Sequence, residues 1–268
     1  MMKTALTGVM SASRDLSVIS NNLANAMTVG FKRSTSQFVD VMGLSQNDQP
    51  GVNIGQGAMT QVVRRSDSQG NIRNTDSALD LALVGPGHFT FGDANPTNGE
   101  ASYVYSRSGQ LQITPAGLLV DRNSGRPLMA ISGGNPKSIN LNSATNGNIA
   151  GIQSLSIDAK GVISISSLDG TTKSVGTLAI ARFNNEDGLK NQGGAVFTET
   201  DESGPVELGR ASINGVGKIQ QGALEEANVD MTAEMLRMIQ AQQAYNGNAR
   251  ALQTGSEMLR SSIETLTR

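Results

Sequence analysis

The chain has no cysteine and no tryptophan, and its single histidine is His88. The absence of cysteine excludes disulfide bonds and thiol chemistry. With one histidine and no cysteine, a zinc site built from several His and Cys ligands is excluded too. Aromatic residues make up only 3% of the 268 residues, whereas glycine occurs 31 times. This composition favours short strands joined by many turns over a large hydrophobic core.

The sequence also lacks a charge excess and a long hydrophobic run. The formal net charge is −2, so no strong field attracts nucleic acid or an anionic membrane. No stretch approaches the roughly 20 apolar residues of a transmembrane helix. Residues 1–15 lack both a continuous apolar segment and a small-residue cleavage site, so we expect no cleaved secretory signal. We therefore expect no nucleic-acid partner and no membrane insertion.

Helical heptad patterns are present at the two ends of the sequence. Apolar and small residues recur in alternating steps of three and four over 2–26 and again over 231–266. A mean spacing of 3.5 residues places a narrow seam on one side of a helix, as in a coiled coil. Asp230 is placed to cap the second helix, and Glu234 falls in its first turn. The predicted seam residues are Val9, Leu16, Ile19, Leu23, Met235, Met238, Tyr245, Leu252, Leu259 and Ile263.

The outward faces of these two helices carry Gln, Asn, Ser and Ala where a solvent-facing helix usually carries many Lys and Glu residues. Such a surface suits burial against copies of the same helix. The alternative is a pair of ordinary amphipathic helices covering a globular core. The pattern alone leaves both interpretations open.

Between the helices, short alternating runs bounded by Gly, Asn, Asp or Pro predict an antiparallel β-rich region. The expected fold is therefore mixed α and β, with terminal helices paired as a coiled coil and a central β domain joined to them by extended connectors. The predicted parts are an N-terminal helix over 1–30, a connector over 31–75, a β-rich domain over 76–204, a return connector over 205–229 and a C-terminal helix over 230–268.

No group of residues predicts an active site. His88 follows a Gly-Pro-Gly turn and is interpreted as a polar loop residue. Glu225 and Glu226 precede the second helix, where acidic residues favour the helix dipole. We expect no catalytic residues, no cofactor and no metal, and hence a protein that is not an enzyme.

Two motifs resemble those of the bacterial flagellar rod and hook protein family. The first, ISNNLANAMTVGFK, matches the N-terminal pattern of that family, and the second, LEEANVD followed by MIQAQQAY, matches its C-terminal block. The central segments ALDLALVGPGHFTF and YVYSRSG agree more loosely, with His88 standing where the family usually has a bulky apolar residue. The motif residues are Asn21, Asn22, Asn25, Gly30, Phe31, Lys32, Asn228, Val229 and Asp230.

This resemblance implies an axial protein of the flagellum. Proteins of that family leave the cell through the flagellar type III export apparatus and assemble as a hollow helical tube. The terminal helices form an inner coiled coil that lines the channel, and the β domain faces outward. The implied partners are copies of the same chain, the neighbouring rod and hook proteins and the export apparatus. The implied location is the rod of the basal body, which spans the periplasm and transmits motor torque.

The length favours a rod subunit, because hook proteins generally carry an additional outer β domain. A short hook protein outside the cell is the second choice. Two hypotheses propose other classes of protein. One is a monomeric β-domain binding module, whose helices cover its own core, and the other is a periplasmic enzyme acting on cell-wall polymer. The enzyme would need paired carboxylates in a cleft, and no spacing in the sequence supports such a pair.

Overall fold

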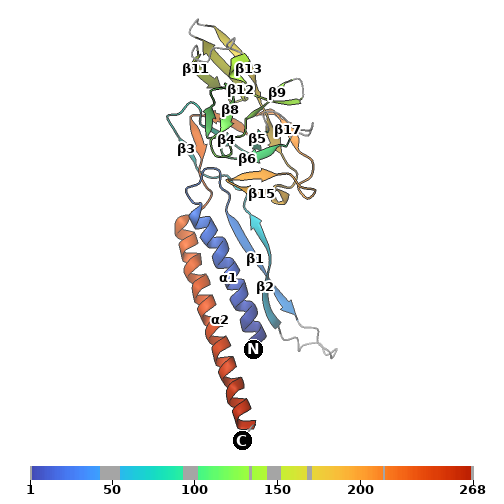
Figure 1. Cartoon of the computed structure of the whole chain (residues 1–268), viewed down its shortest axis with the longest axis vertical. Coiled ribbons are helices and arrows are strands. Elements are labelled where there is room, and N and C mark those ends of the chain that lie inside the picture. The colour runs from blue at the N-terminus through green and yellow to red at the C-terminus, as the bar shows by residue number, and fades with distance from the viewer. Residues whose placement is uncertain are drawn as a thin grey trace. The chain divides into compact units, whose positions relative to one another are not determined.

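The computed structural model describes residues 2–42, 55–92, 102–132, 135–143, 152–167, 171–213 and 215–266. Two long helices, α1 (Met2–Ala24) and α2 (Met231–Leu266), enclose a β-rich middle in the sequence (Figure 1). The prediction of a mixed fold with this order of elements is confirmed. The chain divides into two compact units. We call Met1–Ala26, Arg33–Ser66 and Val229–Arg268 the helical unit, and Met27–Lys32 and Asp67–Asn228 the β unit.

In the helical unit, α1 and α2 pack side by side in antiparallel directions. Asn22 near the end of α1 lies against Glu234 in the first turn of α2. A Cβ atom built on Gly8 would lie 2.7 Å from Asn248, and one built on Gly255 would lie 3.1 Å from Met2. These contacts occur in opposite order along the two helices, as an antiparallel pair requires.

The start of α2 is fixed by a side-chain cap. The carboxylate of Asp230 accepts hydrogen bonds from the backbone N–H groups of Thr232 at 2.9 Å and Ala233 at 3.2 Å. These two donors lie in the first turn, where no helical carbonyl can reach them. The predicted cap at Asp230 is therefore confirmed.

A β-hairpin covers α1 in the helical unit. Strands β1 (Ser34–Met42) and β2 (Gly55–Arg65) pair in antiparallel register, and residues 43–54 between them lie outside the described residues. The hydroxyl of Ser11 on α1 donates a hydrogen bond to the carbonyl oxygen of Ala58 on β2 at 3.0 Å. The segment predicted as an extended connector over 31–75 thus contains a hairpin that packs on the first helix.

The β unit contains the remaining strands, and all of their pairings are antiparallel. One sheet has the order β15-β16-β6-β5-β14-β17, another has the order β10-β9-β13-β12-β11, and three strand pairs are β18-β4, β19-β3 and β7-β8. The strands are β3 (Ile72–Asn74), β4 (Leu81–Val84), β5 (His88–Phe91), β6 (Val104–Ser106), β7 (Leu111–Ile113), β8 (Leu119–Asp121), β9 (Met129–Ser132), β10 (Asn135–Ser138), β11 (Ile152–Ile157), β12 (Val162–Ser167), β13 (Thr172–Leu178), β14 (Ile180–Arg182), β15 (Lys190–Gly193), β16 (Val196–Thr198), β17 (Glu207–Gly209), β18 (Lys218–Gln221) and β19 (Ala223–Glu225). In the described part of the chain, the short 3₁₀ turns η1 (Leu141–Ser143) and η3 (Glu186–Gly188) lie between strands.

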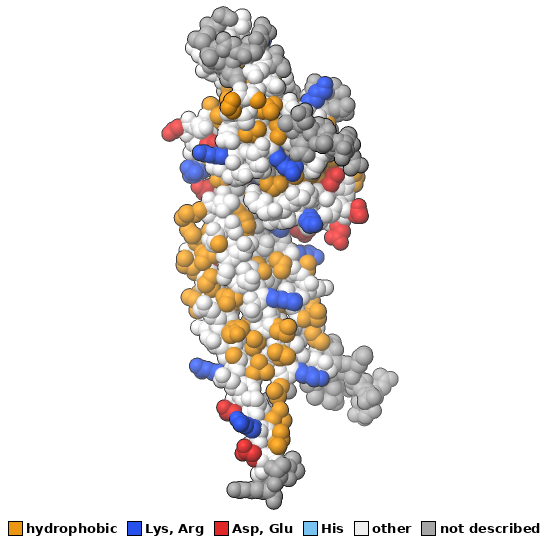
Figure 2. Space-filling view, viewed as in Figure 1, with side chains coloured by type: hydrophobic (Ala, Val, Ile, Leu, Met, Phe, Trp, Pro, Cys, Tyr) orange, Lys and Arg blue, Asp and Glu red, His pale blue; other side chains and the backbone are white. Residues whose placement is uncertain are grey.

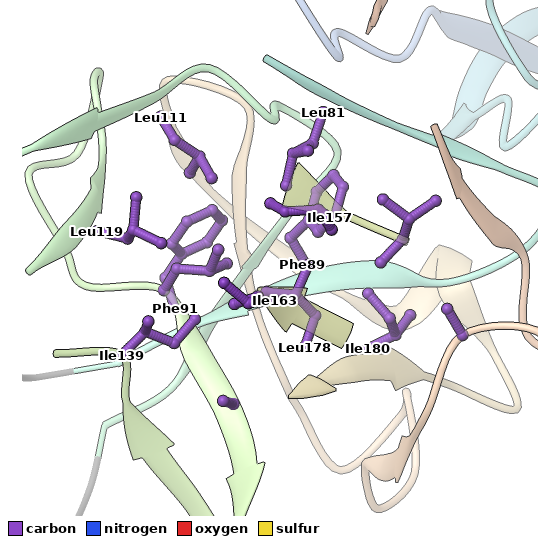
Figure 3. Packing of buried hydrophobic residues seen from close by; sticks show 14 of the residues in the cluster. Leu81, Phe89, Phe91, Leu111, Leu119, Ile139, Ile157, Ile163, Leu178 and Ile180 are labelled. Atoms are coloured by element: carbon purple, nitrogen blue, oxygen red, sulfur yellow. The ribbon is translucent and has the colours of Figure 1, made fainter. Parts of the chain in front are cut away.

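Side chains from several of these strands meet in one hydrophobic core (Figure 3). Phe89 and Phe91 from β5 contribute to it, together with Ile163 from β12 and Leu178 from β13, and all four are fully buried. Residues far apart in the sequence therefore stabilise the β unit by removing apolar surface from water.

His88 is not a loop residue, and the prediction for it was wrong. It begins β5, is 2% exposed, and belongs to a strand whose four residues are all buried. Its ring packs edge-on against Phe183 and Phe197, with ring centroids 6.1 and 6.0 Å away. The turn before it suggested a solvent-exposed position, but the strand that follows is covered on both faces.

Candidate assembly surface

The helical unit exposes most of its large hydrophobic side chains. Among the described residues, all exposed large hydrophobic side chains except Met27, Val84 and Ile213 belong to this unit. On the face shown in Figure 2, hydrophobic side chains gather over the helices and the hairpin. The exposed side chains of the helical unit are Met2, Leu6, Met10, Phe38, Val39, Met59, Val62, Val63, Met231, Met235, Leu236, Ile239, Tyr245, Met258, Leu259 and Ile263. An apolar surface of this extent is typical of an interaction site.

The predicted seam residues fall into two groups. On α1, Ile19 is buried, and Val9, Leu16 and Leu23 are partly buried. On α2, Met238 and Leu252 are partly buried, whereas Met235, Tyr245, Leu259 and Ile263 are exposed. The more covered face of α2 also includes residues that the hydrophobic pattern did not select, namely Glu234, Ala241, Asn248 and Gly255. The role of the seam residues in assembly stays a prediction.

A hollow opens in the helical unit at the start of α1. Its volume is about 560 Å³, and its walls come from the first residues of α1, the start of β2 and the last turns of α2. Met2, Met258 and Leu259 make much of its lining apolar. A smaller hollow of about 200 Å³ lies between α1 and β2 beside Met10 and Met59.

A buried glutamate holds the elements of the helical unit together. Glu234 is fully buried and accepts a hydrogen bond from Asn22 Nδ2 at 3.3 Å. Its other oxygen, Oε1, pairs with Arg33 at 3.5 Å and with Arg237 at 3.6 Å. The side-chain Nδ2 of Asn22 also donates to the carbonyl oxygen of Ser34 at 2.7 Å, and its Oδ1 accepts the backbone N–H of Ser34 at 2.9 Å. The cluster therefore connects α1, the start of β1 and α2.

A second buried glutamate organises the β unit. Glu225 in β19 is fully buried and pairs with Lys32 at 2.6 Å and with Arg107 at 3.3 Å. Its Oε1 also accepts the backbone N–H of Gly70 at 3.0 Å. Lys32 donates to the carbonyl oxygen of Ser68 at 2.9 Å. Three segments distant in the sequence are thus joined at one carboxylate.

This arrangement corrects the interpretation of Glu225 as a partner of the helix dipole. Five residues separate it from the first residue of α2, and its carboxylate is occupied by two cations. Burial lowers the pKa of Lys32 from its ordinary value, and the attraction of Glu225 opposes that change. Breaking such a buried pair by removing one partner is strongly unfavourable.

Neighbouring residues anchor in different units. Lys32 pairs with Glu225 in the β unit, and Arg33, the next residue, pairs with Glu234 in the helical unit. Two residues before Lys32, Gly30 has a positive φ of 70°, and its backbone N–H donates a hydrogen bond to the carbonyl oxygen of Glu225 at 2.8 Å. The segment from Gly30 to Arg33 is therefore held by an ion pair of Lys32 within the β unit and by an ion pair of Arg33 within the helical unit.

The other motif residues support the same region. The side-chain amide of Asn25 caps the end of α1 by donating to the carbonyl oxygen of Asn21 at 2.9 Å and to Asn21 Oδ1 at 3.1 Å. The backbone N–H of Asn228 donates to the carbonyl oxygen of Phe31, which is buried, and its side chain donates to Ser68. Val229 is partly buried at the return to the helical unit.

Comparison with protein families and known proteins agrees with these motifs. The model described as "Flagella basal body rod protein" matches residues 2–32, and the model "Flagellar basal body rod FlgEFG protein C-terminal" matches residues 220–265. The flagellar basal-body rod protein FlgG of Buchnera aphidicola subsp. Schizaphis graminum is 33% identical over 267 residues, covering 94% of each chain. The chain belongs to the flagellar basal-body rod protein family.

Other rod proteins are similarly related. FlgG of Bacillus subtilis is 30% identical to this rod protein over 268 residues, with 96% of this chain and 95% of the relative covered. Among solved structures, the hook protein FlgE2 of Helicobacter pylori is 17% identical; the match covers 69% of this chain and 48% of the hook protein chain, with a TM-score of 0.25. The prediction of a rod-type structural subunit of the flagellar basal body is confirmed, and the family is a structural one.

The two matched segments of the rod protein are the ones that its buried clusters join. Asn22 and Lys32 lie in the N-terminal match, and Glu225 and Glu234 lie in the C-terminal match. The sequence contained only a weak signal for these contacts, namely a charged residue directly after the apolar residues Phe31 or Leu224. Neither α1 nor α2 of the described chain is apolar enough over a sufficient length to cross a membrane.

Proposed function

We propose that this chain polymerises with copies of itself into the hollow axial rod and transmits motor torque through it. In this proposal α1 and α2 form the inner layer as a coiled coil, and the β unit faces outward. The partners are further copies, the neighbouring rod and hook proteins and the flagellar type III export apparatus.

The observation that carries the proposal is the imbalance between buried and exposed apolar side chains in the helical unit. Among its described residues, the buried hydrophobic side chains are Ala5, Ala12, Ile19 and Ala241. Three of the four are alanines, whose burial contributes little compared with the roughly 1.5–3 kcal/mol of a large apolar side chain. Contacts with neighbouring copies would cover the exposed residues and supply the missing stability.

The two buried glutamate clusters support a mechanical role. Lys32 and Arg33 are adjacent, and each is held by a buried carboxylate. Such clusters are stabilised by several charge-assisted hydrogen bonds at once. We propose that they resist local rearrangement of the chain segments that pass between the units when torque is applied.

The experiment that tests polymerisation changes one partly buried seam residue. Leu252→Asp places a charge in the helix interface, so we expect loss of rods by electron microscopy and loss of motility. The β unit should keep its fold, measured by its dispersed amide NMR signals. Gln253→Asp, at an exposed neighbouring position, is the matched control and should assemble. Motile cells with normal rods from Leu252→Asp would contradict the seam assignment.

A monomeric binding module makes a different prediction for the purified chain. If the helices only cover their own chain, their amides should be protected from hydrogen exchange in the monomer. If they order on assembly, residues 2–24 and 231–266 should exchange quickly in the monomer and slowly in the rod. The β unit serves as the internal reference in both states.

A further inference from the structure

Helix α2 extends well beyond α1. The two helices contain 36 and 23 residues, and α1 begins opposite Gly255 of α2. Residues 256–266, which we call the α2 extension, therefore continue past the start of α1 by about 16 Å at 1.5 Å per residue. The extension thus reaches beyond the helix pair of its own chain.

The α2 extension keeps the apolar face that α2 presents along the helix pair. Leu259 and Ile263 follow Leu252 and Gly255 at helical spacing and are 52% and 61% exposed. Leu259 also lines the hollow of about 560 Å³ at the start of α1. Along most of α2 this apolar face is covered by α1. At the α2 extension the same face lines an apolar groove, which has room for side chains from another helix.

The first turns of α2 carry a complementary apolar patch. Met231, Met235 and Ile239 follow one another at steps of four, which places them on one side of the helix. All three and the neighbouring Leu236 are exposed. Farther along the same side stand the polar residues Gln242, Asn246 and Gln253. The patch therefore ends after Ile239.

These two surfaces lie at opposite ends of one helix. Met235 and Leu259 are separated by 24 residues, about 36 Å along α2, so they cannot meet within one chain. A contact between two different surfaces at opposite ends repeats head to tail and builds an open filament. The negative end of one α2 dipole would also approach the positive end of the next, which is a favourable arrangement.

We infer that successive copies meet end to end, with the first turns of α2 from one copy seated in the groove between the α2 extension and the start of α1 of the next copy. This inference rests on the proposed polymerisation and names the segments that make one of its contacts. The end of α1 is the less suitable occupant, because Asn21 and Asn25 there are polar and already bonded to each other.

Engineered cysteines test the contact without background, because the chain contains no cysteine. The double variant Met235→Cys/Leu259→Cys should form a ladder of disulfide-linked oligomers when assembled full-length protein is oxidised, since disulfides require Cα atoms within about 7 Å. Each single variant should stay monomeric, and a mixture of the two single variants should give a dimer. Gln253→Cys/Leu259→Cys is the matched control. Gln253 lies on the same side of α2 as Met235, five turns farther along the helix, and this double variant should give no ladder.

Several results would overturn the inference. A dimer from Met235→Cys alone would show a symmetric contact, and a ladder from Asn25→Cys/Leu259→Cys but not from Met235→Cys/Leu259→Cys would assign the groove to the end of α1. Equal ladders from the Met235 and Gln253 variants would show unspecific proximity. Rods without a ladder would refute this contact and leave polymerisation standing, whereas loss of rods in the unmodified chain would refute polymerisation itself.

A second measurement does not depend on disulfide geometry. Met235→Ser/Ile239→Ser should raise the critical concentration for assembly tenfold or more, because both substitutions remove an apolar side chain that the contact would take out of water. Gln242→Ser/Gln253→Ser is the control and should leave that concentration unchanged. An unchanged critical concentration in the first variant would contradict the end-to-end contact.

Discussion

The two units of this rod protein use hydrophobic side chains in opposite ways. In the β unit, phenylalanine, leucine and isoleucine residues from many strands are buried in one core. In the helical unit, large hydrophobic side chains are mostly exposed, and alanines provide most of the buried apolar residues. We therefore expect the β unit to be stable alone and the helical unit to gain stability from contacts with other copies.

Buried charges follow a different distribution from the hydrophobic residues. Among the described residues, each unit contains one fully buried glutamate that pairs with cations, namely Glu225 in the β unit and Glu234 in the helical unit. Specific polar contacts thus occur in both units, although the hydrophobic core is well developed in only one. The two units can be tested separately, because a substitution in one unit should leave the stability of the other nearly unchanged.

The largest effect is expected at the buried cluster of the β unit. Glu225→Gln leaves Lys32 and Arg107 buried without a carboxylate, so the free energy of unfolding of the β unit should fall by about 3–5 kcal/mol. Chemical denaturation followed by a β-unit probe measures it. Glu226→Gln is the control, because Glu226 makes an exposed pair with Arg73 that contributes no more than about 1 kcal/mol. Similar losses in both variants would refute the role of burial.

A smaller loss is expected when Gly30 is replaced. In Gly30→Ala the new Cβ would lie 2.6 Å from the backbone nitrogen of Ser108, at a φ of 70°. Backbone strain alone costs about 1–3 kcal/mol, and the clash adds to it. Gly204→Ala separates these causes, because Gly204 has a φ of 74° and no atom within 4 Å of the new Cβ. Denaturation should show a greater loss for Gly30→Ala, and equal losses would argue against close packing there.

Removing the helix cap should affect only the helical unit. Asp230→Ala deprives the N–H groups of Thr232 and Ala233 of their acceptor, which costs about 1 kcal/mol. In assembled rods, hydrogen exchange should become faster over the first turns of α2, while exchange in the β unit stays unchanged. Thr232→Ala keeps the cap and is the control. Faster exchange in the β unit would show that the two units are coupled.

The smallest effect is a gain in stability. Gly247→Ala should favour helix α2 by about 0.5–1 kcal/mol, because nothing lies within 4 Å of the new Cβ. Circular dichroism of the monomer should show more helix. Gly8→Ala is the comparison, since its Cβ would come within 2.7 Å of Asn248 and the gain should be offset. More helix but poorer assembly in Gly247→Ala would indicate that a neighbouring copy lies against that position.

Much of this architecture could be predicted from local sequence patterns. The alternating steps of three and four predict α1 and α2, and the side chain of Asp230 predicts where the second helix begins. Short alternating runs between turn residues predict strands in the middle of the chain. These features depend on hydrogen bonds and burial within a few residues, which is why the sequence alone indicates them.

Some features of the helices could not be predicted in the same way. A heptad pattern shows that one side of α2 is apolar but not which residues another helix covers. Met238 and Leu252 are partly covered, whereas Met235 and Tyr245 from the same predicted seam are exposed. That difference depends on where α1 begins and ends and on how the two helices are rotated against each other.

The order of elements, the cap of α2 and the family motifs at both ends could all be recognised in the amino-acid sequence. The pairing of Lys32 with Glu225, the contact of Asn22 with Glu234 and the burial of His88 among aromatic rings became visible only in the folded chain. Local patterns reflect the preferences of residues that are neighbours along the chain. Partners some two hundred residues apart are chosen by the packing of whole elements, which brings buried charges within reach of each other.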